Sequence, residues 1–302
     1  MTIPRIAPYV MPAQWPASRV QWPLQAHRAA LLVHDMQAYF LDFYDTAQAP
    51  VPTLLAHVRQ LIDQAHALGI PVFFSAQPHQ QSPEQRGLLQ AMWGPGLTTH
   101  APEVAQIHPA VAPAPGDVVL TKWRYSAFQR SDLAERLDAL DRDQLLVCGV
   151  YAHIGCLMSA AEAFMKDIQP FFVADALADF SAQEHAQALD YVAQRCGRVL
   201  GTAQALAELA PAVPEGEAPA LRPPASLADW MTQLHRLLQL PEGSFTADDA
   251  LTDWGLDSIR LMAIVEMARQ SGLSLGFPEL AQAASARDQW QRLSAKPMSQ
   301  AA

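Results

Sequence analysis

The sequence predicts an α/β protein: a doubly wound parallel sheet in a Rossmann-type three-layer sandwich, followed by a small all-α domain of four helices. Two observations support this fold class. Short apolar runs alternate with amphipathic segments along most of the chain, which is typical of strands and helices that alternate in a parallel sheet. After about residue 205 the composition changes, because prolines accumulate and only a helical period returns beyond them.

The first domain is expected to contain six strands, connected by helices. The apolar runs that predict strands are Ala29–Val33, Pro71–Ala76, Val118–Lys122, Gln144–Val150, Pro170–Ala174 and Arg198–Gly201. The amphipathic segments that predict helices are Thr53–Leu68, Ser131–Leu140, Cys156–Asp167 and Gln183–Arg195. Residues 1–28, with four early prolines, suggest an extended arm lying on this body. The segment 77–116 has no clear period, and loops of that length usually cover or form a site.

We expect the first domain to span residues 1–207 and a Pro-rich linker to span 208–225. The small domain should occupy residues 226–294, with a short tail at 295–302. Its helices are predicted near 227–238, 258–270 and 286–293, with a short turn near 278–283.

The composition excludes several classes of protein. A formal net charge of −10 argues against non-specific nucleic-acid binding, which needs a basic surface. No apolar run is long enough to span a bilayer, and the N-terminus lacks the apolar core of a signal peptide. Three cysteines are too few for a disulfide framework. We therefore expect a cytoplasmic protein with no membrane or nucleic-acid partner.

Four polar side chains follow the predicted strands, at or just after the point where each strand ends: Asp35, Gln77, Lys122 and Tyr151. In a doubly wound sheet, ligands bind at the carboxyl ends of the strands, so these side chains form a candidate site. Two plainer interpretations remain open at this point. Asp35 could cap the following helix, and Asp35 with Lys122 could form a purely structural ion pair.

Six segments of the first domain resemble the isochorismatases, which hydrolyse the enol ether of isochorismate to 2,3-dihydro-2,3-dihydroxybenzoate and pyruvate. The segments are LVHDMQAYF (32–40), AQP (76–78), MWGPGL (92–97), KWRYSAF (122–128), GVYAHIGC (149–156) and VADALADF (173–180). The resemblance implies an isochorismatase-like fold and this hydrolase activity.

The wider family includes cysteine hydrolases such as nicotinamidases, which use an Asp, a Lys and a nucleophilic Cys. Their cysteine position falls on Gly155, and Cys156 is one residue further on, where we expect it to point into the core. The enol ether requires only a general acid, for which Asp35 is the candidate. The alternatives are an amidohydrolase of the cysteine type that is fused to a carrier, and an inactive carrier scaffold.

The resemblance also implies the roles of the other site residues. Lys122 and the backbone of Gly155 belong to the catalytic set with Asp35, and the expected substrate-binding residues are Phe40, Gln77, Arg86, Trp93, Tyr125 and Tyr151. His34 and His153 flank the strand ends and are expected to be packing or hydrogen-bonding residues. The histidines show no metal-binding spacing, so no metal is expected.

In the small domain, the stretch from Gly255 to Ser258 resembles the G-x-D-S site of acyl and peptidyl carrier domains. The resemblance implies that a phosphopantetheinyl transferase attaches 4'-phosphopantetheine covalently to Ser258. Asp257 could instead be a simple helix cap. Met262 and Phe277 could form an exposed apolar patch for partner enzymes, or could be core residues.

Isochorismatase, linker and carrier occur in this order in the bifunctional isochorismatase and aryl carrier proteins of catecholate siderophore synthesis. The resemblance implies that an adenylating enzyme loads 2,3-dihydroxybenzoate, as a thioester, onto the arm of Ser258. The condensation domain of a nonribosomal peptide synthetase would then accept that aryl acid. The family further suggests a homodimer formed through the hydrolase domain.

Overall fold

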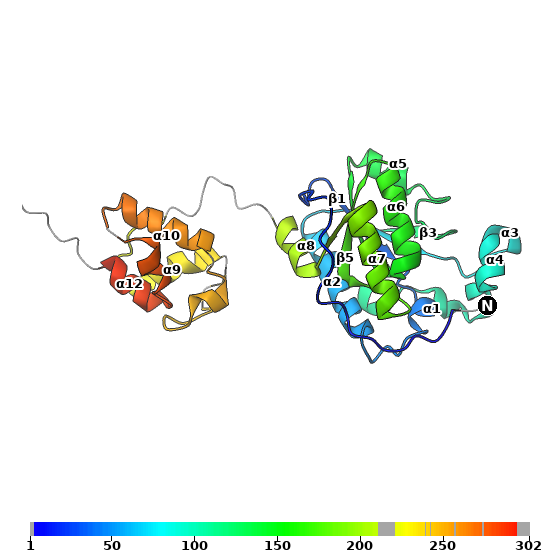
Figure 1. Cartoon of the computed structure of the whole chain (residues 1–302), viewed down its shortest axis with the longest axis horizontal. Helices are drawn as coiled ribbons and strands as arrows, with labels where there is room; N and C mark the ends of the chain where they lie inside the picture. Colours follow the sequence, from blue (N-terminus) through cyan, green and yellow to red (C-terminus); the bar gives the residue numbers. More distant parts are fainter. Residues whose placement is uncertain are drawn as a thin grey trace, which may run out of the picture. The chain divides into compact units, whose positions relative to one another are not determined.

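The computed structural model describes residues 3–210, 221–238, 240–241, 243–256, 258–273 and 275–294. The chain forms two compact units, Met1–Pro211 and Ala212–Ala302, each of which is described by itself (Figure 1). Residues 211–220 of the expected linker and the expected tail at 295–302 lie outside the described residues. Among the described helices, none has the length and apolar character that crossing a bilayer requires.

The first unit is built on one parallel sheet of six strands. The strands are β1 (Ala29–His34), β2 (Val72–Ala76), β3 (Val118–Thr121), β4 (Gln144–Val150), β5 (Gln169–Ala178) and β6 (Arg198–Leu200). Their order is β3-β2-β1-β4-β5-β6, and every neighbouring pair is parallel. The order reverses between β1 and β4, so the carboxyl ends of these two strands define the switch point at which doubly wound sheets bind ligands.

Helices cover both faces of the sheet, as the alternating pattern predicted (Figure 1). On one face lie α2 (Val51–Ala67) and α8 (Thr202–Leu209). On the other lie α5 (Leu133–Ala139), α6 (Leu157–Met165) and α7 (Ala182–Arg195). β1 is buried along its whole length, because one set of its side chains packs into each of the two cores.

The segment 77–116, which has no period in sequence, contains several short helices. They are α3 (Pro83–Arg86), α4 (Leu88–Trp93) and the 3₁₀ turns η1 (Gly96–Thr99), η2 (Pro102–Ala105) and η3 (Pro109–Val111). Another short helix, α1 (Ala38–Leu41), follows β1. These helices span one turn or little more, which is too short to show an amphipathic period.

The region after β4 departs from the predicted helix at Cys156–Asp167. A π-helical turn, η4 (Ala152–Cys156), comes first, and α6 begins only at Leu157. The amide of Cys156 donates to the carbonyl of Tyr151, five residues earlier, at 3.3 Å. This wider turn follows the switch-point strand directly, in a position where π-helical turns often shape functional sites.

The residues before β1 form an extended arm that contacts the body along its length. The amide of Ile6 donates to the carbonyl of Phe43 at 2.8 Å, and that of Arg19 donates to the carbonyl of Ala193 at 3.0 Å. The hydroxyl of Tyr9 contacts Nδ1 of His185 at 3.1 Å. The arm is therefore an integral part of the first unit.

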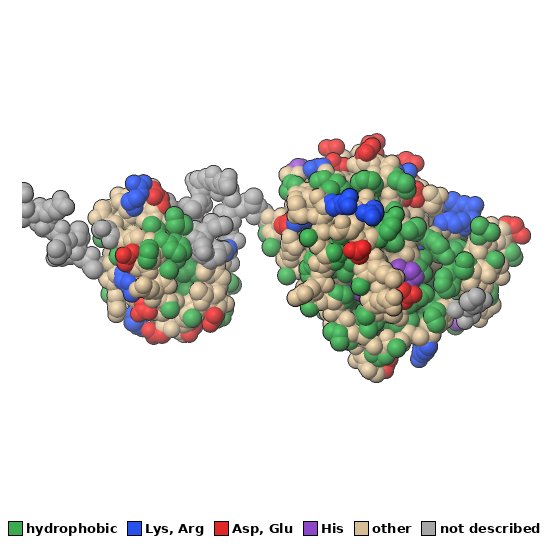
Figure 2. Space-filling model, in the orientation of Figure 1, with side chains coloured by type: hydrophobic (Ala, Val, Ile, Leu, Met, Phe, Trp, Pro, Cys, Tyr) green, Lys and Arg blue, Asp and Glu red, His purple; other side chains and the backbone are tan. Residues whose placement is uncertain are grey.

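The second unit is helical. Its elements are α9 (Leu227–Leu238), the 3₁₀ turn η5 (Leu251–Trp254), α10 (Ser258–Gln270), α11 (Phe277–Ala281) and α12 (Ala286–Ser294). Its core includes Trp230 and Ile264, which are fully buried. Met262 and Phe277 are exposed, at 52% and 37%. Figure 2 shows hydrophobic side chains gathered on part of the visible face of this unit.

Candidate active site

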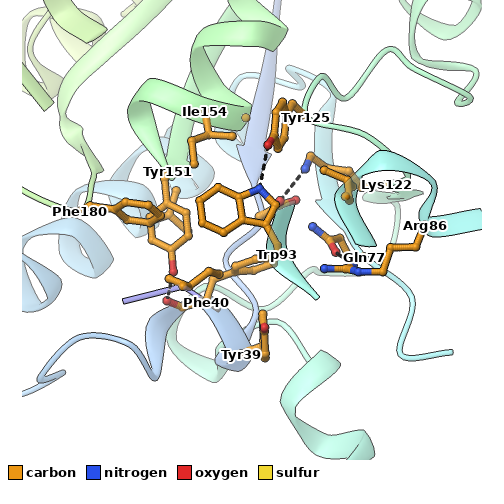
Figure 3. Close-up of a pocket in the computed structure, with 15 residues that line it drawn as sticks. Tyr39, Phe40, Gln77, Arg86, Trp93, Lys122, Tyr125, Tyr151, Ile154 and Phe180 are labelled. Carbon is orange, nitrogen blue, oxygen red and sulfur yellow. Dashed lines mark hydrogen bonds and ion pairs between the residues drawn. The ribbon is translucent and has the colours of Figure 1, made fainter. Parts of the chain in front are cut away.

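A pocket lies at the carboxyl ends of the strands, beside the switch point, and contains about 510 Å³ of empty space, part of it open to solvent (Figure 3). All nine residues that the sequence analysis assigned to the hydrolase site line it: Asp35, Phe40, Gln77, Arg86, Trp93, Lys122, Tyr125, Tyr151 and Gly155. The structure therefore brings together residues that are up to 120 positions apart in the chain (155 − 35 = 120).

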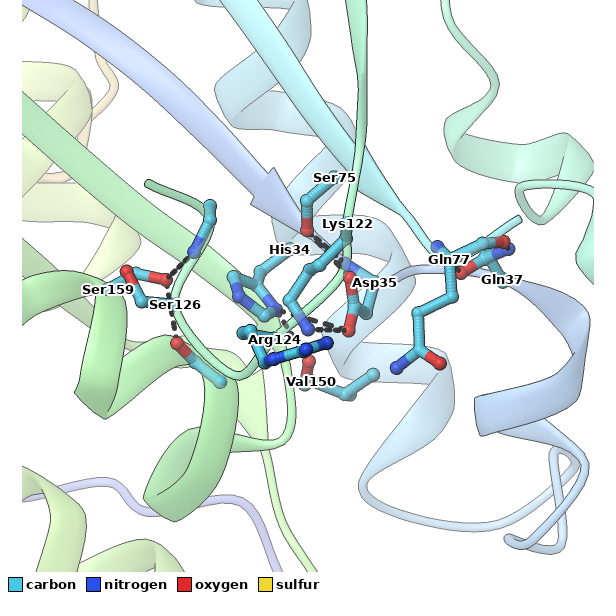
Figure 4. Close-up of polar contacts among 12 residues, drawn as sticks. His34, Asp35, Gln37, Ser75, Gln77, Lys122, Arg124, Ser126, Val150 and Ser159 are labelled. Carbon is cyan, nitrogen blue, oxygen red and sulfur yellow. Dashed lines mark hydrogen bonds and ion pairs between the residues drawn. The ribbon is translucent and has the colours of Figure 1, made fainter. Parts of the chain in front are cut away.

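The polar centre of the pocket is a buried carboxylate that is held at both oxygens (Figure 4). The ammonium of Lys122 donates to Oδ2 of Asp35 at 2.7 Å, and the hydroxyl of Ser75 donates to Oδ1 at 2.6 Å. Asp35 and Lys122 are each only 4% exposed. Since Asp35 follows β1, Ser75 lies in β2 and Lys122 follows β3, three neighbouring strands position this carboxylate.

The backbone at Asp35 turns out of the sheet at that point. Its φ of 48° lies in the left-handed region, which Asp adopts more readily than most residues. The amide of Asp35 still donates to the carbonyl of Ser75 at 3.1 Å, so the turn remains tied to β2. No side-chain hydrogen bond caps the helix that follows at Ala38, which argues against the capping role for Asp35.

Arg86 brings a second cation to the pocket. It is 4% exposed at the end of α3, and burial lowers the pKa of its guanidinium. Its Nε donates to the carbonyl of Gly94, and its Nη1 lies 3.4 Å from Oε1 of Gln77. Among the described side chains, no carboxylate forms an ion pair with it. A buried guanidinium without a carboxylate partner suits an anionic ligand.

Gly96 provides the space that Arg86 occupies. Its φ is 61°, and a Cβ at this position would lie 2.5 Å from a guanidinium nitrogen of Arg86. Only glycine fits this position without displacing the cation. The Gly-Pro-Gly stretch at 94–96 thus holds Arg86 from two sides, through the carbonyl of Gly94 and the missing side chain of Gly96.

Aromatic rings form the wall opposite these charges (Figure 3). The indole of Trp93 donates to the hydroxyl of Tyr125 at 2.7 Å, and its ring lies edge-on to Phe180 with centroids 6.1 Å apart. The hydroxyl of Tyr151 donates to the carbonyl of Phe40 at 2.6 Å, and burial raises the pKa of this phenol well above its usual value. The pocket therefore combines an apolar wall for a ring with cations for acidic groups.

Gly155 lines the pocket, whereas Cys156 does not. The thiol of Cys156 is fully buried in the core beneath α6, and burial raises its pKa well above the usual value. The expectation that it points into the core is confirmed. None of the described residues that line the pocket is a cysteine.

The two histidines at the strand ends have different surroundings. His34 is fully buried, and burial lowers its pKa to about 4. His153 is half-buried and bonds to the carboxylate of Asp179. Burial lowers the pKa of His153, but the Asp179 carboxylate outweighs this effect and raises the pKa above its usual value. Asp179 also accepts from the amide of His153 at 2.7 Å, which ties the π-helical turn to the end of β5.

Sequence reasoning missed Ser75, the buried hydroxyl partner of Asp35, and several residues that line the pocket. Ser75 is the polar residue inside the apolar run VFFSA of β2, and that interruption was the available signal. Tyr39 and Phe180 also line the pocket, and both lie within the segments that carry the family resemblance. Ile3, from the arm, had no such signal.

The second unit places the candidate attachment residue, Ser258, at the first position of α10. The expected cap Asp257 lies outside the described residues. Free amides at a helix N-terminus favour an anion, so the backbone position suits a phosphodiester. Within the described part of the chain, no group of three or more His, Cys, Asp or Glu side chains is placed to hold a metal ion.

A buried carboxylate–ammonium pair at the switch point of a doubly wound sheet has groups that can transfer a proton, and the described lining of this pocket contains no cysteine that could serve as a nucleophile. Comparison with known proteins specifies the class further. The isochorismatase domain family matches residues 29–204, and the phosphopantetheine attachment site family matches residues 231–293. The chain belongs to the isochorismatase family, and its C-terminal part is a phosphopantetheine attachment domain.

Two relatives match nearly the whole chain, and a third matches two thirds of it. An isochorismatase of Bacillus subtilis is 43% identical over 97% of this chain and 95% of its own length. The enterobactin synthase component B of Escherichia coli is 43% identical over 97% of this chain and 99% of its own. A phenazine biosynthesis protein of Pseudomonas fluorescens is 50% identical over 66% of this chain and 96% of its own length.

A solved structure supports the fold. The cysteine hydrolase from Pseudomonas syringae pv. phaseolicola superposes with a TM-score of 0.58 at 24% identity, over 64% of this chain and 96% of its own. At this identity the likeness concerns the fold alone.

Proposed function

We propose that the first unit hydrolyses the enol ether of isochorismate to 2,3-dihydro-2,3-dihydroxybenzoate and pyruvate, with Asp35 as general acid and no covalent intermediate. The observation that carries this proposal is the buried Asp35–Lys122 pair in a pocket whose described lining contains no thiol. The relatives named an isochorismatase and a component of enterobactin synthase support the choice of substrate.

In the proposed reaction, Asp35 transfers a proton to the terminal methylene carbon of the enol ether. The resulting oxocarbenium ion is captured by water, and the hemiketal that forms collapses to pyruvate and the diol. The proton released by the water restores Asp35, so atoms and charge balance. The acid needs only to be within reach of that carbon, because no nucleophile has to be activated.

In the proposed reaction Asp35 donates the proton, and the ammonium of Lys122 donates a hydrogen bond to the same carboxyl group. The substrate is a dianion, and its carboxylates add negative charge to the pocket and compete for the ammonium of Lys122. In this proposal the ammonium of Lys122 leaves Asp35 and pairs with a carboxylate of the bound substrate.

The remaining pocket residues position the substrate. Arg86 and Gln77 hold a carboxylate, for which the planar guanidinium is suited. Trp93 and Phe40 pack against the ring, while Tyr125, Tyr151 and the backbone of Gly155 bind its polar groups. The aromatic contacts between Trp93, Phe180 and Tyr151 support this wall.

The first test is release of pyruvate from isochorismate, followed with a lactate dehydrogenase couple. Asp35→Asn removes the acid and should lower kcat by roughly 10²–10⁴-fold. Cys156→Ala is the matched control, since a thiol mechanism requires that side chain and ours does not. A folded wild-type protein that releases no pyruvate, or an inactive but folded Cys156→Ala variant, would exclude the proposed mechanism.

We further propose that Ser258 carries 4'-phosphopantetheine and presents 2,3-dihydroxybenzoate as a thioester. A phosphopantetheinyl transferase attaches the arm, an aryl-acid adenylating enzyme loads it, and a condensation domain of a nonribosomal peptide synthetase accepts the aryl group. The side chains of Met262 and Phe277 are exposed, and we propose that such partners dock on them. We also propose that the protein works in the cytoplasm, as a homodimer formed through the hydrolase unit.

Incubation with coenzyme A and a broad-specificity transferase tests the carrier assignment. Intact-mass measurement should show the gain of one phosphopantetheine arm on the wild type and none on Ser258→Ala. Mass gain that persists in Ser258→Ala would place the arm elsewhere. The hydrolase activity of Ser258→Ala serves as the control that the protein is folded.

A further inference from the structure

The imidazole of His34 occupies the space that a side chain on residue 155 would need. A Cβ built on Gly155 would meet Cε1 of His34 and would lie 2.9 Å from its Nε2 and 3.0 Å from its Nδ1. Real Cβ atoms do not approach other atoms so closely. The place of a side chain at Gly155 is therefore already taken by His34.

His34 has little room to move away. It ends β1, is fully buried, and its Nδ1 lies 3.1 Å from the carbonyl of Val150 in β4 (Figure 4). Its backbone pairs with Ser75 of β2 on one side and with Gly149 of β4 on the other. An added side chain at residue 155 would have to displace packed strand residues and could not simply push aside a flexible surface group.

The occupied space is next to the reacting groups. Nδ1 of His34 lies 3.7 Å from Oδ2 of Asp35, the same oxygen that accepts from Lys122 at 2.7 Å. A side chain on residue 155 would thus begin beside the carboxylate–ammonium pair. A thiol at this place would have a base and a cation as neighbours, which is the arrangement that activates a nucleophile.

We propose that His34 is a positioning residue that keeps the space beside the Asp35–Lys122 pair free of any side chain from residue 155, and so restricts the pocket to proton-transfer chemistry. The packing part of this inference is independent of the substrate. Only its catalytic meaning rests on the proposed ether hydrolysis. Failure of the pyruvate assay would therefore leave the packing test intact, and the two failures can be told apart.

A double-mutant cycle in the full-length protein tests the packing. Gly155→Ala should lower the unfolding temperature of the first unit by roughly 4–8 °C, because it overpacks a buried contact. His34→Val empties the space, so adding Gly155→Ala to it should cost much less than adding it to the wild type. If Gly155→Ala alone does not fold, recovery of folding in the double variant is the expected result.

A second buried histidine of the same unit provides the matched control. His185 is also fully buried, bonds to Tyr9 and to the carbonyl of Ala174, and is not among the atoms nearest to Gly155. The effects of His185→Val and Gly155→Ala should be additive. Additive effects in the His34 pair, or a Gly155→Ala variant as stable as the wild type, would overturn the proposal.

Alkylation of a thiol introduced at position 155 tests the chemical consequence. With iodoacetamide at pH 7, the introduced thiol should react on the order of tenfold faster in the His34→Val/Gly155→Cys variant than in Gly155→Cys alone, as mapped by peptide mass spectrometry. Background should be low because Cys148, Cys156 and Cys196 are buried. The His185→Val/Gly155→Cys variant controls for general loosening. Equal rates in the three variants would overturn the proposal.

Discussion

The buried pair Asp35–Lys122 is the residue-scale feature on which the proposed hydrolase mechanism rests. An ion pair with both partners 4% exposed gains attraction but loses hydration, so it adds little net stability, whereas removal of one partner leaves a costly lone charge. The hydroxyl of Ser75 offsets part of this cost at the other carboxylate oxygen. The sequence suggested the pair from strand ends alone, but the strand pairing that brings Ser75 beside Asp35 was not visible there.

His34 leads to a prediction about pH. Burial lowers its pKa to about 4 in the folded protein, against 6.5 for the free side chain. The unfolded chain thus binds a proton first as pH falls, and the stability contributed by neutral His34 is lost between about pH 6.5 and pH 4. The gap of interest is the free energy of unfolding of the wild type minus that of His34→Val. This gap should therefore fall by roughly 3 kcal/mol from pH 7 to pH 4.

Urea unfolding at several pH values, read by hydrogen–deuterium exchange on peptides of β1, measures this gap. Other titrating groups are present in both proteins and cancel in the difference. A gap that stays constant with pH would show that His34 takes up its proton equally well in the folded and unfolded chain.

At the scale of elements, the strands and long helices were predictable because each has an apolar period and a packing partner. β5 was predicted to end at Ala174 but runs to Ala178. Asp175 interrupts the apolar run, and its carboxylate accepts from the amide and the hydroxyl of Thr202, both at 2.7 Å. The hydrogen bonds that stabilise the Asp175 carboxylate come from Thr202, a helix residue far along the chain. Such a tertiary contact cannot be predicted from a local sequence pattern.

The short helices α3 and α4 were not predicted, yet they bring Arg86 and Trp93 to the pocket. Ser82 begins α3 with a capping box, in which its hydroxyl accepts from the amide of Gln85 at 3.2 Å and the Gln85 side chain accepts from the amide of Ser82 at 2.8 Å. The Ser-x-x-Gln spacing was the available signal. The family resemblance predicted that Arg86 belongs to the site, but it did not predict that Arg86 is buried.

The prediction at this scale concerns Arg86, the last residue of α3. Arg86→Gln should raise KM for isochorismate by roughly 10–100-fold, because a charge-assisted hydrogen bond contributes about 1.5–3 kcal/mol. Arg86→Lys keeps the charge but loses the planar fork, so it should recover only part of the loss.

Steady-state kinetics by pyruvate release measure both variants. Arg130→Gln, which removes an exposed arginine that does not line the pocket, is the control and should match the wild type. An unchanged KM in Arg86→Gln would mean that the guanidinium does not bind the substrate.

At the scale of the whole molecule, the chain consists of two compact units, each with its own core. The change in composition near residue 205 predicted this division into two units. α8 was not anticipated, because its alanine-rich sequence resembles the start of the linker, but Arg198 pairs with Glu208 at 2.6 Å and fixes it to β6.

The division predicts that residues 1–211 alone keep the hydrolase activity. All described residues that line the pocket belong to this unit, so kcat/KM should stay within roughly twofold of the full chain. Pyruvate release by the truncated protein measures this, with circular dichroism to verify its folding. Lost turnover in a well-folded truncation would show that the second unit contributes to the reaction.

The extended arm has a consequence for how the protein is made. It precedes the rest of the first unit in the chain, but its contacts join residues far apart: Tyr9 with His185 across 176 positions, and Leu24 with Glu208 across 184. Since Ile3 of the arm and Phe180 both border the pocket, the site is not complete until the chain as far as Phe180 has left the ribosome. Contacts of such long range slow folding, so a nascent chain remains inactive until nearly all of its first unit has been translated.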